Sequence, residues 1–352
     1  MTTKLEKAAT RRTFLKATLA TPYMFFSSGN ANSSVAFKER KVVKNSFIAR
    51  TITEVDERRL TEDVFYLART PLPSRKLNLT LPGHKENTLY EADDYLTDQL
   101  EKCHYKVKRE EVPVQAFRCD SNKPKAHQYS EPLPEDPWYK AYNLYAERPG
   151  RTRPEEIILL LAHKDSQSWV DSPGAYDNAV GTAAVIELAR LFANFEPECT
   201  IRFLLCNEEH TPWTSVVAAE NARRRGDNLV AIFNLDGLGG KSQEEIDAGI
   251  KTNVTMYTVD EGKALADLMT EVIQVYGIGL RHRVGRREEP GDDDGSFVNA
   301  GFGRAVINIG SFPFADPQYH REGDVAERVD FENVRLAAQA TLAAVLELDR
   351  EA

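Results

Sequence analysis

The sequence predicts an α/β fold: a single domain with a mixed, mostly parallel central sheet and helices on both faces. The 352 residues are 41% hydrophobic and 28% charged, as expected for a folded chain with a sizeable core. α/β enzymes of this length often form one domain. From about residue 150 onward, short apolar runs alternate with segments that carry apolar residues at helical spacing. Such alternation predicts strands joined by crossover helices, and therefore parallel pairing.

The first part of the predicted domain is helical and then irregular. Periodic apolar residues predict amphipathic helices over 54–69 and 89–103. Between them, residues 72–87 contain prolines and a glycine, which indicates a loop. Strands are expected over 104–112 and 138–148, on either side of a polar, proline-bearing stretch.

The second part carries the alternation itself. Residues 156–162 are almost continuously apolar, which is typical of a strand covered on both faces. Further strands are predicted over 200–206, 229–235, 255–259 and 304–309, and helices over 177–195, 214–225, 262–276 and 330–348. Sheets of this kind place their ligand sites at the carboxyl ends of the strands.

The N-terminus resembles a twin-arginine export signal. Arg11-Arg12 is followed by Phe14, Leu15 and Lys16 and then by a short, weakly apolar stretch. A disordered basic tail is the alternative. We expect a signal peptide over 1–31, a linker over 32–50 and one folded domain over 51–352. The protein would then use the twin-arginine export machinery and be periplasmic or extracellular, without a stable membrane span after signal removal.

Charge and cysteine content exclude other classes. The net charge is −9, and removal of residues 1–31, which contain five basic residues and one acidic residue, would make it −13. This charge argues against nucleic acid as a partner. The four cysteines form no CxxC pair. Cys199 and Cys206 flank one predicted strand and would be about 23 Å apart, too far to pair, whereas a disulfide between Cys103 and Cys119 stays open.

Histidines and acidic residues follow the predicted core strands. They are His163 and Asp165 after 156–162, Glu208 and Glu209 after 200–206, Asp236 after 229–235, His320 after 304–309, and Asp177 at the start of a helix. Each has a structural explanation on its own, such as helix capping by Asp177. Together at one sheet edge, two histidines and three carboxylates could surround two divalent ions that share one carboxylate. Zinc accepts these ligands, and manganese or cobalt are alternatives.

In order, type and spacing, these residues resemble the co-catalytic di-zinc aminopeptidase family, which includes bacterial leucyl aminopeptidases, glutamate carboxypeptidases and glutaminyl cyclases. The resemblance spans roughly residues 50–350 and implies a zinc-exopeptidase-like catalytic domain over 51–352. The motifs that carry it are His163-Lys164-Asp165-Ser166, Pro173-Gly174-Ala175-Tyr176-Asp177-Asn178-Ala179-Val180-Gly181, Glu208-Glu209, Leu235-Asp236 and His320.

The resemblance implies a role for each of these residues. Asp177 would bridge two zinc ions, His163 and Asp236 would complete one ion, and Glu209 and His320 the other. Asp165 would orient His163 through its second ring nitrogen. Glu208 would act as the general base.

Two segments depart from the family pattern. His210-Thr211-Pro212-Trp213 replaces the glycine-containing sequence that usually follows the paired glutamates. Asp292-Asp293-Asp294 stands where a histidine is common. We expect His210 to be a surface histidine. Residues 281–294 combine four arginines and a histidine with five acids. Contact with substrate is one interpretation of this segment, and a solvated loop is the one we expect.

The sequence thus predicts a zinc-dependent aminopeptidase acting on peptide substrates. Alternatives are a glutaminyl-cyclase-like acyltransferase that uses one zinc ion, a carboxypeptidase of the same family, and a non-catalytic binding domain. The sequence contains no H-E-x-x-H, G-x-S-x-G or P-loop motif, so other hydrolase chemistries have no support.

Overall fold

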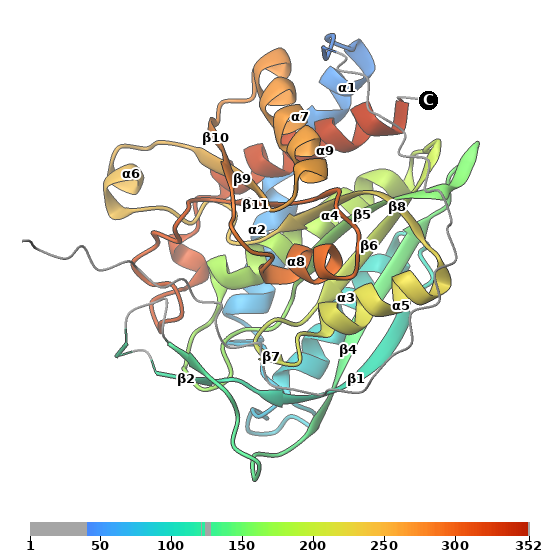
Figure 1. Ribbon diagram of the computed structural model, residues 1–352. Helices are drawn as coiled ribbons and strands as arrows, with labels where there is room; N and C mark the ends of the chain where they lie inside the picture. The colour runs from blue at the N-terminus through green and yellow to red at the C-terminus, as the bar shows by residue number, and fades with distance from the viewer. Residues whose placement is uncertain (1–40, 121, 124–127, 351–352) are drawn as a thin grey trace, which may run out of the picture. The chain divides into compact units, whose positions relative to one another are not determined.

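A computed structural model describes residues 41–120, 122–123 and 128–350. Among these residues, nine strands form one sheet in the order β10-β9-β11-β8-β5-β6-β4-β1-β7, and two more form a short hairpin (Figure 1). The strands are β1 (Lys108–Ala116), β2 (Arg118–Cys119), β3 (Tyr129–Ser130), β4 (Tyr139–Arg148), β5 (Arg153–His163), β6 (Cys199–Cys206), β7 (His210–Thr211), β8 (Asn228–Leu235), β9 (Thr252–Tyr257), β10 (Arg281–Arg286) and β11 (Ala305–Ile309). The predicted single α/β domain with a mixed sheet is confirmed.

The centre of the sheet is parallel. β5 pairs in parallel with both β6 and β8, and β8 pairs in parallel with β11. On the outer sides, β4 is antiparallel to β6 and β9 is antiparallel to β11. The four central strands therefore end at the same edge, where the chain turns back into helices.

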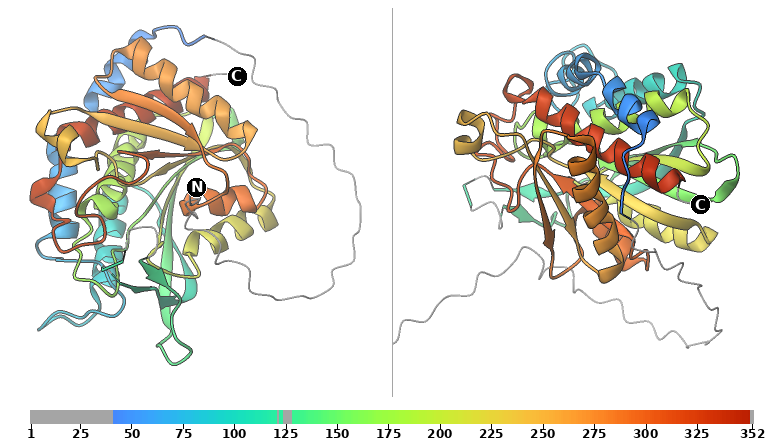
Figure 2. Two further views of the ribbon diagram at one scale, coloured as in Figure 1. Left: turned by 60° about the vertical axis from the view of Figure 1, so that its left-hand side comes forward. Right: turned by 90° about the horizontal axis from the view of Figure 1, so that it is seen from above.

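Helices cover both faces of the sheet (Figures 1 and 2). They are α1 (Ser46–Thr51), α2 (Glu57–Ala68), α3 (Thr88–Lys102), α4 (Val180–Ala193), α5 (Thr214–Arg225), α6 (Gln243–Asp247), α7 (Asp260–Tyr276), α8 (Asp292–Asn299) and α9 (Phe331–Arg350). α4 packs against β5 on one face, with α2 and α9 behind it, whereas α8 and α5 pack together on the other face.

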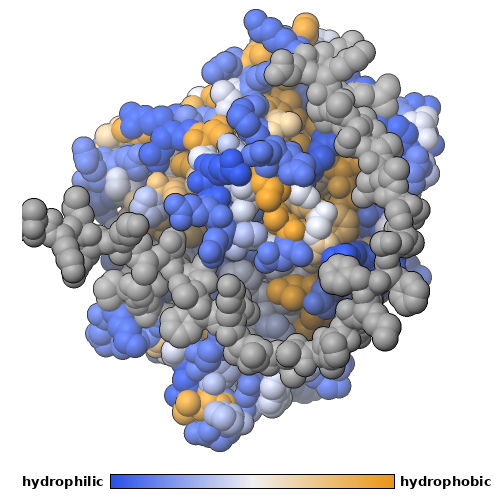
Figure 3. Space-filling view, in the orientation of Figure 1, coloured by the Kyte–Doolittle hydropathy of each residue, from blue (hydrophilic) through white to orange (hydrophobic). Residues whose placement is uncertain are grey.

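Alternate side chains of β5 enter the cores on the two faces. Ile158, Leu160 and Ala162 lie in the larger hydrophobic cluster with α2, α4 and α9. Leu159 and Leu161 lie in a second cluster with α5 and α8. A strand buried on both faces reads as a continuous apolar run, which is why residues 156–162 predict it correctly. The surface facing the viewer in Figure 3 is mainly hydrophilic, with hydrophobic residues gathered near its centre.

Two local predictions need correction. The strand expected over 104–112 begins four residues later, because α3 reaches Lys102 and His104 takes a left-handed conformation (φ 64°). Residues 281–294 are not a solvated loop: they form edge strand β10 and the start of α8. Pairing with β9 and packing on β11 decide this structure, and neither is visible in the local sequence.

Several predictions concern the N-terminus and the cysteines. The predicted signal peptide (1–31) and residues 32–40 of the predicted linker lie outside the described residues, and α1 begins within the last part of that linker. All four cysteines are free, so the Cys103–Cys119 disulfide left open by the sequence is not formed. No helix in the described part of the chain is both long and apolar enough to cross a membrane.

Candidate metal centre

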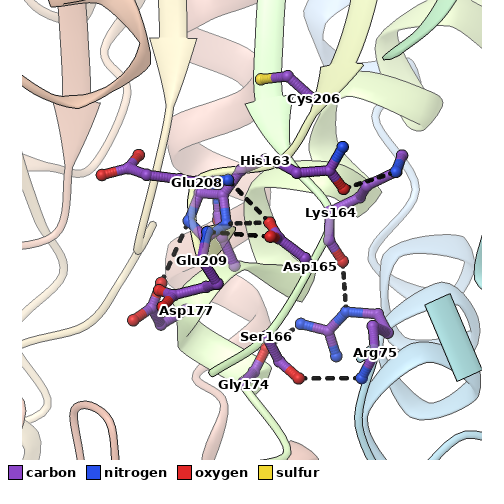
Figure 4. Close-up of polar contacts among 12 residues, drawn as sticks. Arg75, His163, Lys164, Asp165, Ser166, Gly174, Asp177, Cys206, Glu208 and Glu209 are labelled. Carbon is purple, nitrogen blue, oxygen red and sulfur yellow. Dashed lines mark hydrogen bonds and ion pairs between the residues drawn. The ribbon is translucent and has the colours of Figure 1, made fainter. Parts of the chain in front are cut away.

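The predicted site residues come together at the carboxyl edge of the parallel strands. His163 ends β5, Glu208 and Glu209 follow β6, Asp236 follows β8, and His320 lies in the loop after β11. Two groups have ligand atoms within 4.8 Å of one another: His163 with Glu208 and Asp236, and Asp177 with Glu209 and His320. Figure 4 labels four members of this cluster: His163, Asp177, Glu208 and Glu209.

Asp177 lies between the two histidines. Its Oδ1 atom is 3.2 Å from Nε2 of His163, and its Oδ2 atom is 2.8 Å from Nε2 of His320. Nε2 of His163 is also 3.5 Å from Oδ1 of Asp236, and Nε2 of His320 is 3.5 Å from Oε1 of Glu209. One carboxylate therefore faces both halves of the cluster, each half with its own histidine and a further carboxylate.

The turn Ala175–Ala179 places Asp177 in the site. The backbone N–H groups of Tyr176 and Asp177 donate to the carboxylate of the buried Asp324 at 2.8 and 3.1 Å. Gly174 has φ 64°, a left-handed conformation that favours glycine. At Gly181 a Cβ atom would lie 2.1 Å from the carbonyl oxygen of Leu235, so the family glycine is needed for close approach of α4 to the end of β8.

Asp165 lies behind His163 and organises the ends of β5 and β6 (Figure 4). Its Oδ1 atom is 3.3 Å from Nδ1 of His163, as expected for the group that orients this ring. The two carboxylate oxygens also accept the backbone N–H groups of Glu208 and Glu209, both at 2.9 Å. Burial alone would raise the pKa of Asp165, but hydrogen bonds from His163 and His210 lower it below its usual range.

His210 is buried, so the prediction of a surface histidine is wrong. Its Nδ1 atom lies 2.7 Å from Oδ2 of Asp165, and its Nε2 atom lies 3.2 Å from Oγ of Ser168. The imidazole thus replaces the usual small residue by filling the space behind Asp165. The sequence gives no signal for this contact, because histidine is common on surfaces.

Glu208 lies beside a second group of carboxylates at the start of α8. Burial and then the charges of Asp293 and Asp292 raise the pKa of Glu208 well above its usual range. Asp293 accepts a hydrogen bond from the thiol of Cys206 at 3.1 Å. Asp294, at the position where the family often has histidine, forms a buried ion pair with Arg287. Asp294, which departs from the family pattern, is therefore paired with an arginine seven residues earlier in the chain.

The residues of the cluster fit divalent cations. Oε2 of Glu208 is buried without a hydrogen-bond partner, and so is Oδ1 of Asp236 apart from its 3.5 Å contact with Nε2 of His163. Burial raises the pKa of Asp236 to about 7, the expected result for an acid crowded by other carboxylates without a cation. Nitrogen and oxygen donors in this mixture are the ligands that zinc and related metals bind.

A narrow, shallow pocket opens beside Asp177 and Asp236. Its walls are aromatic, from Tyr176, Phe314 and Tyr319, and the last two rings stack with centroids 5.0 Å apart. A group held in this pocket would lie next to the candidate metal ligands Asp177 and Asp236. The sequence did not predict this pocket, since Phe314 and Tyr319 reach the site only through the fold of the His320 loop.

This fold and this site define a class of α/β metallohydrolases. The chain belongs to one family of that class: residues 143–345, more than half of its length, match Peptidase family M28. The predicted resemblance to zinc aminopeptidases and their relatives is therefore confirmed.

Curated relatives are moderately similar in sequence. A probable zinc metalloprotease of Pyricularia oryzae is 27% identical, with 59% of this chain and 50% of that protein covered. Leucine aminopeptidase 1 of Leptosphaeria maculans is 25% identical, with 60% of this chain and 56% of that protein covered. The chain thus spans about half the length of these relatives.

Solved structures share the fold. The LapA aminopeptidase of Legionella pneumophila superposes with a TM-score of 0.66 at 16% identity, covering 90% of this chain and 78% of that chain. A glutaminyl cyclase of Bacteroides thetaiotaomicron superposes with a TM-score of 0.60 at 17% identity, covering 83% and 98%. Because both activities occur on this fold, the fold alone does not separate them.

Proposed function

We propose that the protein is an exported di-zinc aminopeptidase that removes N-terminal residues from peptides. The observation that carries the proposal is Asp177, whose two oxygens face His163 and His320 with Glu208 close by. A carboxylate placed in this way fits a bridge between two ions, and paired ions suit peptide hydrolysis.

Each ion would have its own set of ligands. His163 and Asp236 would hold the first, Glu209 and His320 the second, and Asp177 would bridge them. Asp165 would keep the ring of His163 oriented through its Nδ1 atom. Zinc bound there would polarise the peptide carbonyl and make a bound water more acidic.

Glu208 would move the proton. Its carboxylate lies in the group with His163 and Asp236, and its Oε2 atom has no partner of its own. As the water oxygen bonds to the carbonyl carbon, Glu208 would take the proton that the water loses. When the C–N bond breaks, Glu208 would return this proton to the leaving amine.

Two observations favour the N-terminal end of the substrate. The site is crowded with carboxylates, and the chain has a net charge of −9, so a cationic amine is the better-attracted end. Arg287 lies near Glu208 but is already paired with Asp292 and Asp294, so it is not free to bind a terminal carboxylate. The names of the leucine aminopeptidase and LapA relatives agree with this choice.

A one-zinc glutaminyl cyclase activity is the second candidate, since a glutaminyl cyclase shares the fold. The presence of both histidines and all the predicted carboxylates in one cluster favours two ions instead. The presence of all these residues also argues against a non-catalytic binding domain.

Export rests on the sequence of residues 1–31, and it would place the enzyme in the periplasm or outside the cell.

The proposal can be tested with a panel of aminoacyl chromogenic substrates, assayed with and without a chelator. Metal analysis of the same protein gives the number of zinc ions per chain. We expect turnover that the chelator abolishes and two zinc equivalents per chain. One equivalent together with cyclisation of N-terminal glutamine would favour the alternative activity. Absence of turnover with full metal content would favour a binding domain.

A further inference from the structure

Arg75 lies beneath the cluster of candidate metal ligands, in the loop that follows α2 (Figure 4). Its side chain is completely buried, which is unusual for arginine. Its four side-chain hydrogen bonds all go to backbone carbonyl oxygens rather than to carboxylates. A buried guanidinium held in this way needs an explanation, because desolvating a charge is costly.

The four bonds connect three separate parts of the chain. Nε donates to the carbonyl of Lys164 at 2.6 Å, in the segment between His163 and Asp165. Nη1 donates to Pro173 at 2.7 Å and Nη2 to Gly174 at 2.8 Å, immediately before the turn that carries Asp177. A further bond from Nη1 reaches Leu67 of α2 at 2.7 Å.

Backbone contacts between Arg75 and Ser166 complete this junction. The N–H group of Arg75 donates to Oγ of Ser166 at 2.9 Å, and the N–H group of Ser166 donates to the carbonyl of Arg75 at 3.0 Å. A Cβ atom on Gly174 would lie 2.9 Å from Nη2 of Arg75, so the guanidinium and this turn are in close approach. The planar fork of arginine suits such a junction, whereas lysine offers only one point of attachment.

The charge of Arg75 matters as well as its geometry. Burial lowers the pKa of Arg75 to about 10, and the charges of Asp165, Asp324, Asp177 and Glu209 oppose this shift. The guanidinium is therefore still protonated at neutral pH. Its positive charge interacts favourably with these four buried carboxylates, in addition to the imidazoles of His163 and His320 that contact some of them.

We propose that Arg75 is a positioning residue that joins the loops carrying His163 and Asp177 and offsets the repulsion among the site's carboxylates before metal binds. The inference rests on the proposed metal centre of the M28 fold. A structural cross-link alone would stabilise the protein equally with and without metal. A counter-charge matters most when the metal is absent, because bound zinc would supply positive charge itself.

The test compares the thermal unfolding midpoint of the full chain after chelation and after loading with zinc. In Arg75→Met we expect both midpoints to fall, and the metal-free midpoint to fall further. The gap, that is, the difference between the zinc-loaded and the metal-free midpoint, should therefore widen by about 3 °C or more. Arg75→Lys keeps the charge but loses the fork, so both midpoints should fall with the gap close to that of the unmutated chain. Arg190→Met is the matched control, since Arg190 is partly buried and pairs with Asp63 of α2 from the last turn of α4, at the opposite end of that helix from the Asp177 turn.

The outcomes separate the explanations. Folding of Arg75→Met only in the presence of zinc supports the proposal, and an equal fall of both midpoints, as expected for Arg190→Met, overturns it. If Arg75→Met does not fold at all, Arg75→Lys decides, because a widened gap in that variant overturns a role for the charge. If zinc stabilises the unmutated chain but no aminoacyl substrate is cleaved, the proposed function fails while the role of Arg75 stands.

Discussion

His210 and Asp165 are joined by a buried hydrogen bond of 2.7 Å between Nδ1 and Oδ2. Asp165 is the acceptor, since an ionised carboxylate has no proton to donate. On its other oxygen, the same carboxylate faces Nδ1 of His163 at 3.3 Å. The histidine that departs from the family pattern is therefore connected, through one aspartate, to a predicted metal ligand.

We expect His210→Ala to weaken zinc binding by ~10–100-fold, the usual cost of removing a group that supports a metal ligand. It should also lower the free energy of unfolding by about 1–3 kcal/mol, because Oγ of Ser168 and Oδ2 of Asp165 each lose a buried partner. Asparagine can place its amide nitrogen near the position of Nδ1, so His210→Asn should recover most of the zinc affinity. Titration calorimetry with zinc would measure the affinities, and denaturant unfolding of the metal-free proteins would measure the loss of stability. Equal zinc affinities in all three proteins would argue against the connection.

Glu208→Gln should retain both ions and lose ~10²–10⁴-fold in kcat, because glutamine cannot accept the proton of the attacking water. Metal analysis is needed alongside the rate, since Glu208 also lies within reach of His163 and Asp236. Loss of one zinc equivalent would show that Glu208 is a ligand. Unchanged turnover would remove it from the mechanism.

Asp177→Asn should lower both zinc content and turnover. A bridging carboxylate offsets the repulsion between two dications, and an amide carries no charge to do so. Asp171→Asn, in the same segment of the chain but with an exposed side chain, is the matched control and should bind zinc normally. Two full equivalents of zinc in Asp177→Asn would show that Asp177 is not the bridge.

The sequence predicted the cluster of histidines and acids well, because these residues follow apolar strands in a fixed order and carry a family pattern. It did not predict Arg75, whose partners are backbone carbonyls 8 to 99 positions away and leave no side-chain pattern to read. β10 was missed because its arginines resemble a solvated loop and only pairing with β9 makes it a strand. α8 begins with three aspartates, and its helix is stabilised by packing on α5 and β11 rather than by its own sequence.

His282 on β10 should make stability depend on pH. Its Nδ1 atom lies 3.2 Å from the amide nitrogen of Asn253, and burial lowers the pKa of the imidazole to about 4. Below pH ~6.5 the unfolded chain binds the proton more readily than the folded chain. The contribution of His282 is therefore complete above pH 6.5 and is lost as the pH falls towards about 4.

The matched variant for this effect is His282→Gln, which does not titrate. Between pH 7 and pH 4.5 the unmutated chain should lose more stability than the variant, by on the order of 2 kcal/mol. Denaturant unfolding of both proteins at the two pH values measures the difference, and the acids of the metal centre contribute to both proteins alike. Identical losses in the two proteins would contradict the shift at His282.

The end of the peptide that is attacked depends on how the substrate's charges meet the site. The cluster offers Glu208 and other carboxylates to a free amine, whereas the nearby Arg287 is already paired with Asp292 and Asp294. N-acetylation removes the positive charge of the amine and should lower kcat/KM by ~100-fold or more, because a site built for a polar group rejects an analogue that lacks it. C-terminal amidation of the same peptide should have little effect. Mass spectrometry of the products would identify which residue is released from each peptide. If the acetylated peptide is shortened from its C-terminus at the original rate, the enzyme is a carboxypeptidase that uses the same metal centre.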